Sequence, residues 1–295
     1  MLVSSMSRAV FVAFASVALT LPSSVRAQHL LLPMDDAQQN HLKAYGLTYN
    51  AIKAGMKAEW FLNYRGGSFL LPDTPELRRR AGLDGISVEA LSADNLSGIR
   101  AEIASSNMDA IPLEKAPRIA VYTPPDALPW DDAVTLSLKY AGIDYTAIYD
   151  EDVQRGDLSK YDWLHLHHED FTGQLNKFHL GYRDAPWFVD IVEKNTATAR
   201  KLGYPNVPAL KEGIAEHLRR FVERAGFLFA MCGATETLEL AIAGAGEDIA
   251  GPFADGRPMD GGADAKLQWP RAFAFQGVSL EQSPFVNSMS NVDGH

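Results

Sequence analysis

The sequence predicts an α/β fold in which parallel strands alternate with helices that cover both faces of the sheet. Three observations predict it. Short apolar runs of strand length recur along the chain, segments with helical spacing separate them, and Gly or Pro residues stand at the junctions. Strands joined through helices pair in parallel. Hydrophobic residues make up 46% of the 295 residues and charged residues 22%, values typical of a globular protein with a substantial core.

The chain begins with the pattern of a cleavable signal peptide, expected at residues 1–27. Arg8 supplies positive charge, residues 9–21 are almost entirely apolar, and small residues around Val25-Arg-Ala27 match a cleavage site. We expect cleavage after Ala27 and a periplasmic or secreted protein. The apolar stretch is shorter than the ~20 residues that span a bilayer, and no other segment approaches that length, so no membrane span is expected.

Residues 28–114 are expected to form an N-terminal α/β unit. Strands are predicted at 29–33, 58–63 and 86–91, and helices at 36–55, 75–81 and 94–105. The turn Arg65-Gly66-Gly67 has two interpretations, a plain hairpin turn or a ligand-binding loop that holds an anion through its backbone. The segment 112–117, with a proline at each end, is expected to be a linker.

The alternation of strands and helices restarts in residues 115–295. Strands are predicted at 118–123, 145–149, 163–167 and 227–231, with a final short strand at 272–275, and helices at 130–141, 186–202 and 208–225. In a parallel α/β sheet, ligands gather at the carboxyl ends of the strands, so we expect the functional residues at that edge.

Cys232 is the only cysteine in the chain, and it stands at one of these strand ends. The apolar run 227–231 predicts a buried strand, Gly233 and Ala234 permit a sharp turn, and Thr235 is the expected N-cap of a following helix. Such a position favours a thiolate, and the Gly233 and Ala234 N–H groups are expected to stabilise an oxyanion. The alternative without a catalytic role is a buried, inert thiol.

A second candidate follows the strand at 163–167, where the sequence reads His165-Leu-His167-His168-Glu169-Asp170. Alternation places His165 and His167 on one face and His168 on the other. We predict that His167 or His168 deprotonates Cys232, with Glu169 or Asp170 fixing the imidazole tautomer. Asp170 is also a candidate ligand-binding residue.

This histidine-rich strand end has two further interpretations. One is a structural hydrogen-bond network. The other is a metal site formed by His165, His167 and Glu169, although no second ligand cluster with zinc spacing accompanies it, so no metal or cofactor is assigned. The net charge of −10 argues against a nucleic-acid partner, which leaves a small-molecule substrate or ligand as the expected partner.

From about Pro117 to Phe275 the chain resembles the class I glutamine amidotransferase-like superfamily, whose members carry a cysteine nucleophile elbow in a flavodoxin-like sheet. The elbow here is Ala230-Met-Cys232-Gly-Ala234, with alanines where the family pattern has glycines. The whole chain is similar to a group of exported bacterial proteins that carries the label asparagine synthetase B. The segments that carry this similarity are Leu32–Asp35, His41–Gly46, Leu62–Phe69, Pro129–Asp132, Tyr161–Gly173 and Phe227–Cys232.

The resemblance implies a Cys-dependent hydrolase or amidotransferase acting on an amide or acyl bond. In the superfamily the catalytic His and Glu follow the cysteine, whereas His295 is the only histidine after Cys232, and relatives are expected to extend further. The missing pair favours the alternative of a non-catalytic small-ligand binding protein. Asparagine synthetase chemistry is not expected, because the chain lacks an N-terminal catalytic cysteine and a Ser-Gly-Gly-x-Asp-Ser pyrophosphate loop.

Overall fold

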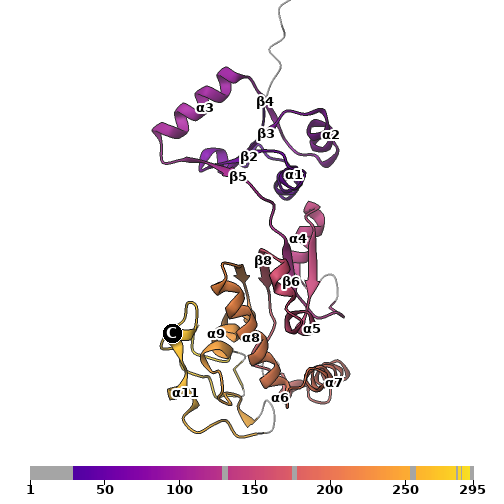
Figure 1. Cartoon of the computed structure of the whole chain (residues 1–295), viewed down its shortest axis with the longest axis vertical. Helices are drawn as coiled ribbons and strands as arrows, with labels where there is room; N and C mark the ends of the chain where they lie inside the picture. The colour runs from indigo at the N-terminus through magenta and orange to yellow at the C-terminus, as the bar shows by residue number, and fades with distance from the viewer. Residues whose placement is uncertain are drawn as a thin grey trace, which may run out of the picture.

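The computed structural model describes residues 29–127, 132–174, 178–252, 257–283, 285–286 and 288–292, which contain two β-sheets with their helices (Figure 1). The signal peptide predicted at 1–27 lies outside these residues. The first sheet and its helices comprise β1 (His29–Leu32), α1 (His41–Lys53), β2 (Ala58–Leu62), η1 (Tyr64–Gly66), β3 (Ser68–Pro72), α2 (Pro75–Asp84), β4 (Glu89–Leu91), α3 (Ala93–Ser105) and β5 (Asp109–Leu113).

The first sheet is antiparallel, with strand order β4-β1-β3-β2-β5, so the parallel pairing predicted for this part of the chain is wrong. The reason lies in the Arg65–Gly67 region, where η1 and Gly67 join β2 directly to β3. Parallel neighbours need a crossover of a dozen residues or more, and this connection is far too short. The turn places Trp60 opposite Phe69 in the resulting hairpin.

Two strands of this sheet were not predicted from the sequence. β3 follows the Gly66-Gly67 turn without a break, and β5 covers the start of the segment expected to be a linker. Pro112 lies inside β5 without disrupting the sheet, because β5 is an edge strand and its missing N–H costs no ladder bond. α1 also begins later than predicted, at His41, where the Asn40 side chain accepts a hydrogen bond from the Lys43 N–H.

The second sheet and its helices follow. They comprise β6 (Ile119–Tyr122), α4 (Ala133–Ala141), β7 (Tyr145–Ile148), α5 (Asp150–Gln154), η2 (Asp157–Lys160), β8 (Trp163–Leu166), α6 (His179–Tyr182), α7 (Pro186–Lys201), α8 (Val207–Glu223), β9 (Phe227–Ala230), α9 (Gly233–Ala243), α11 (Ala263–Lys266) and η4 (Trp269–Arg271).

All pairs in this sheet are parallel, in the order β7-β6-β8-β9, which is the flavodoxin-like order and confirms the predicted α/β fold. Alternation divides its side chains between two cores. On one face, residues of β6 and β8 pack against α5, α8 and α9. On the other face, Ile119 and Val121 pack against Leu138 of α4. That second face is open over β9, where Phe227 and Phe229 are 59% and 45% exposed.

The helices of this sheet begin and end largely where the sequence signals predict. α7 and α8 carry Pro186 and Pro208 in their first turns, and α4 ends at Gly142 with φ 74°. The first residues of the helix predicted at 130–141 lie outside the described residues, and α4 starts at Ala133. The strand predicted at 272–275 is absent, because its backbone N–H groups turn instead toward the buried Glu239 carboxylate.

Helix α1 of the first unit packs against α4 of the second (Figure 1). The two backbones approach so closely that a Cβ on Gly46 would lie 1.8 Å from the Ala141 carbonyl oxygen. Hydrogen bonds flank this contact: Tyr49 donates to the Pro117 carbonyl, and the Asn50 amide donates to the Gly142 carbonyl. Among the helices of the described ranges, none is both long enough and apolar enough to cross a membrane.

Candidate functional site

Cys232 occupies the turn between β9 and α9 with φ 53° and ψ −141°. A non-glycine residue in this region of backbone space costs about 1–3 kcal/mol, so the turn holds the cysteine in a strained conformation. The side chain is exposed. The predicted strand, turn and helix are present, but Cys232 itself takes the N-cap position, so the prediction of Thr235 as N-cap is wrong.

The turn is fixed against the end of β8 by two backbone hydrogen bonds. Met231 donates to the Leu166 carbonyl, and Ala234 donates to the His167 carbonyl, both at 3.2 Å. The Ala234 N–H is therefore already engaged, which argues against its predicted role in stabilising an oxyanion. The Gly233 N–H stands at the first turn of α9, where backbone donors have no intrahelical acceptor.

His167 and His168 pair with each other, with their Nδ1 atoms 2.9 Å apart. One ring must donate and the other accept, so the two tautomers depend on each other. His168 is exposed and His167 half-buried. Within the described residues no hydrogen bond joins either ring to the Cys232 thiol, so the predicted proton transfer between them stays a prediction.

The hydrogen bond described for the Glu169 carboxylate joins it to the backbone, so its predicted role in fixing an imidazole tautomer stays a prediction. Its Oε2 atom accepts a hydrogen bond from the His167 backbone N–H at 2.9 Å, and burial raises the pKa of this carboxyl above its ordinary value. Asp170 accepts hydrogen bonds from the backbone N–H and the hydroxyl of Thr172, which stabilises the loop. The Asp132 carboxylate faces two of the imidazoles: its oxygens lie 3.9 Å from His167 Nδ1 and from His165 Nε2.

His165 is completely buried, between the His167 and Phe229 rings. Neither of its ring nitrogens has a hydrogen-bond partner among the described residues, and burial lowers its pKa, which keeps the ring neutral. In the described ranges no group of three His, Cys, Asp or Glu side chains is placed to hold a metal ion. The metal site considered for His165, His167 and Glu169 is therefore not formed.

A buried ion pair, which sequence reasoning missed, lies beside this loop. Lys211 Nζ is 2.9 Å and 3.0 Å from the two Asp150 oxygens, and the side chains are 4% and 0% exposed. Nζ also donates to the Tyr122 and Tyr149 hydroxyls at 3.0 Å and 3.2 Å. Burial opposes the charge on Lys211, but Tyr149 and Asp150 outweigh it and raise the pKa of the ammonium group.

A signal for this pair exists in the sequence. Lys211 precedes Ile214, Ala215 and Leu218 by three, four and seven residues, and all three are fully buried in α8. A lysine in register with an apolar stripe is therefore a candidate for a buried charge.

A cavity of about 720 Å³ opens at the carboxyl edge of the second sheet. The loop after β6 contributes Pro124 to it, the β8 loop contributes His168 and Glu169, and α8 contributes Lys211. Because β7 and β8 lie on opposite sides of β6, this is the place where the strand order reverses, at which α/β sheets bind ligands. Cys232 is not among the lining residues, although a Cβ on the adjacent Gly233 would lie 3.7 Å from the His168 carbonyl.

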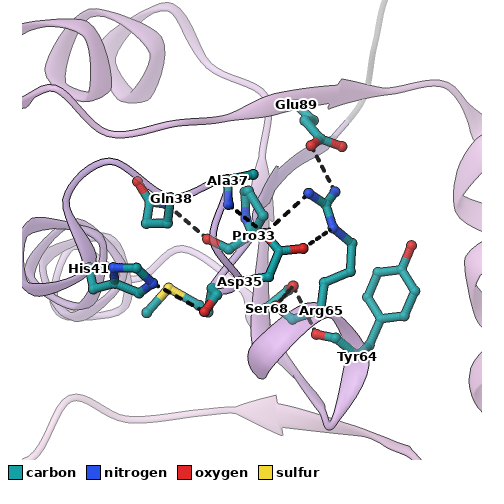
Figure 2. A network of polar contacts seen from close by, with 10 residues as sticks. Pro33, Asp35, Ala37, Gln38, His41, Tyr64, Arg65, Ser68 and Glu89 are labelled. Atoms are coloured by element: carbon teal, nitrogen blue, oxygen red, sulfur yellow. Dashed lines mark hydrogen bonds and ion pairs between the residues drawn. The ribbon is translucent and has the colours of Figure 1, made fainter.

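Figure 2 shows the Arg65 turn in the first unit, where the guanidinium bridges Asp35 and Glu89, each 2.7 Å away. The Arg65 carbonyl accepts from the Met34 N–H, and the Gly67 N–H donates to the Tyr64 carbonyl. Two carboxylates already satisfy the guanidinium. The arrangement therefore favours a structural turn over the anion-binding loop considered for Arg65, Gly66 and Gly67.

The fold and this edge of the sheet define an α/β protein with a flavodoxin-like sheet and a ligand-sized cavity at its strand ends. No family model matches the chain, and comparisons with curated proteins and with solved structures give no match.

Proposed function

We propose that the chain is an exported enzyme with a class I glutamine amidotransferase-like domain, in which Cys232 is the nucleophile toward an amide or related acyl bond. The observation that carries this proposal is the backbone of Cys232, strained at φ 53° and ψ −141° while the thiol is exposed. A cysteine nucleophile elbow needs this arrangement, because the sharp turn lifts the sulfur away from the sheet and toward a substrate.

In the proposed reaction, the Cys232 sulfur attacks the substrate carbonyl carbon and the carbonyl oxygen becomes an oxyanion. The Gly233 N–H is the candidate donor to that oxygen. His167 or His168 accepts the thiol proton and returns it to the departing nitrogen as the carbon–nitrogen bond breaks. Water then hydrolyses the thioester and regenerates the thiol.

The reactivity of Cys232 tests this proposal, and the single cysteine lets intact mass report one site. We expect iodoacetamide to alkylate the folded protein faster at neutral pH than the same protein in denaturant, because the thiolate is the reactive form. Replacing both His167 and His168 with Gln should slow alkylation of the folded protein only. Slower alkylation of the folded protein than of the unfolded protein would contradict an activated nucleophile.

The second candidate is a binding protein without catalysis, and the cavity favours it. The described residues that line this space include His168, Glu169 and Lys211 but not Cys232, so a ligand can occupy it without meeting the thiol. If Cys232→Ser leaves ligand binding unchanged and the thiol proves unreactive, binding alone is the function.

Export is part of the proposal and has its own test. Expression of the full chain in a Gram-negative host should yield a periplasmic protein whose N-terminal residue is Gln28. Recovery from the cytoplasm with residues 1–27 still attached would contradict it.

A further inference from the structure

The cavity at the carboxyl edge of the second sheet has an aromatic wall. Trp187 and Phe178 line it, and Trp187 contacts Phe178 and Phe188 edge to face. Both Trp187 and Phe178 keep a large exposed fraction, 45% and 39%, although each is a large apolar ring. Exposed aromatic faces beside a cavity are available to a ligand, and they attract apolar groups and cations alike.

The cavity is lined by more carboxyl groups than cationic groups. Among the described lining residues, five carry a carboxyl group and two are lysines. The carboxyl-bearing residues are Asp126, Glu151, Glu169, Asp170 and Asp190.

Neither lysine is free to hold an anionic ligand. Lys194 forms ion pairs with both Asp126 and Asp190, and Lys211 is neutralised by its buried ion pair with Asp150. Glu151 is paired with Lys201 at 3.6 Å, and burial raises the pKa of the Glu169 carboxyl. The surplus negative charge therefore comes from Asp126 and Asp190, two carboxylates that share Lys194. A concave surface with surplus negative charge concentrates cations and repels anions.

We infer that this cavity binds an organic cation, that is, a ligand in which a protonated amine or guanidinium is joined to an apolar or aromatic body. The aromatic wall receives the body, and the carboxylates on α7 and the β6 loop hold the cationic group. The volume of about 720 Å³ suits a ligand the size of a dipeptide. The inference goes beyond the proposed function, because it does not require Cys232 to react.

Three matched probes test the inference: the acetylated dipeptide amides Phe-Lys, Phe-norleucine and Phe-Glu. They share one aromatic body and differ in the charge of one side chain. Binding is measured by calorimetry on the Cys232→Ser protein, which separates affinity from turnover. We expect the Lys probe to bind about fivefold or more tightly than the norleucine probe at low salt, and the Glu probe to bind most weakly. The preference for Lys should shrink at about 0.5 M salt, where the Debye length is only a few ångströms.

Two variants on α7 locate the binding. Asp190→Asn removes a lining carboxylate and should reduce the preference for the Lys probe over the norleucine probe severalfold. Glu193→Gln makes the same charge change on the same helix outside the cavity, and it should leave the preference unchanged. Trp187→Leu should weaken the Lys and norleucine probes together, because both present the same ring.

Equal affinities for the three probes, tightest binding of the Glu probe, or no binding at millimolar concentration would each overturn the inference. So would equal effects of Asp190→Asn and Glu193→Gln. Because the protein used in the binding experiment carries Cys232→Ser, these outcomes do not depend on the alkylation result. Each of the two proposals can therefore be refuted without refuting the other.

Discussion

Replacing Lys211 with Met should be among the most destabilising single substitutions in the second unit. The substitution keeps the length of the side chain and removes its charge. It leaves the Asp150 carboxylate with 0% exposure and no counter-ion, although the Tyr122 hydroxyl still donates to it. Unit charges about 4 Å apart interact by ~4 kcal/mol at an effective dielectric constant of ~20, and breaking a buried pair on one side typically costs about 3–5 kcal/mol.

The assay is urea unfolding followed by far-ultraviolet circular dichroism, with a matched variant and a rescue. Lys53→Met removes the same charge from the exposed pair with Asp144, where about 0–1 kcal/mol is expected. Adding Asp150→Asn to Lys211→Met should recover most of the loss, because the buried charge is then gone while a hydrogen-bonding side chain remains.

The result that would refute this reasoning is a Lys211→Met effect no larger than that of Lys53→Met. A double variant less stable than Lys211→Met alone would refute it as well, since the loss would then arise from packing rather than from an uncompensated charge.

Two further expected outcomes rest on named contacts, one at Glu169 and one at a pair of glycines. The folded pKa of Glu169 lies above its ordinary value of 4.5, so the stability that this carboxyl contributes is present below pH 4.5 and declines as pH rises through the raised pKa. Unfolding measured from about pH 4 to 7 should therefore show the native protein losing stability relative to Glu169→Gln. A constant difference in stability between the two proteins would contradict the shift. Gly66→Ala should lower the free energy of unfolding by about 3 kcal/mol, because φ at Gly66 is 77° and the new Cβ would lie 2.4 Å from the Met34 carbonyl oxygen. Gly82→Ala in α2, with open space around it, is the control and should raise the free energy of unfolding by about 0.5–1 kcal/mol. Equal melting temperatures for the two variants would contradict the steric argument.

The second sheet was predictable from the sequence because its signals are local. Its strands are short and mostly apolar, Pro186 and Pro208 mark the starts of α7 and α8, and Gly142 marks the end of α4, at the positions that favour these residues. The first sheet was not predictable in the same way. Whether β1 pairs with its neighbours in parallel or antiparallel orientation depends on chain segments far away, and the short runs of β3 and β5 carry too little pattern to stand out.

The candidate site, too, was predictable from the sequence only in part. The turn at Cys232 could be predicted, since small residues follow an apolar strand, but its N-cap position could not, because φ and ψ at the turn are set by hydrogen bonds to the end of β8. The carboxylate that faces the imidazoles of His165 and His167 was not predicted, for a similar reason. Asp132 is more than 30 positions from His165 and His167 in the sequence. It is the N-cap of α4, the helix that follows β6, and β6 pairs with the strand that carries His165.

The close approach of α1 and α4 bears on how the molecule unfolds. One face of α1 completes the core of the first sheet, while Gly46 on another face meets the Ala141 carbonyl of the second unit. Unfolding of either unit therefore removes the contacts between α1 and α4 that the other unit also uses. The two sheets are therefore expected to unfold in a single cooperative transition. On that expectation, the connection at 114–118 does not separate two independently folding units.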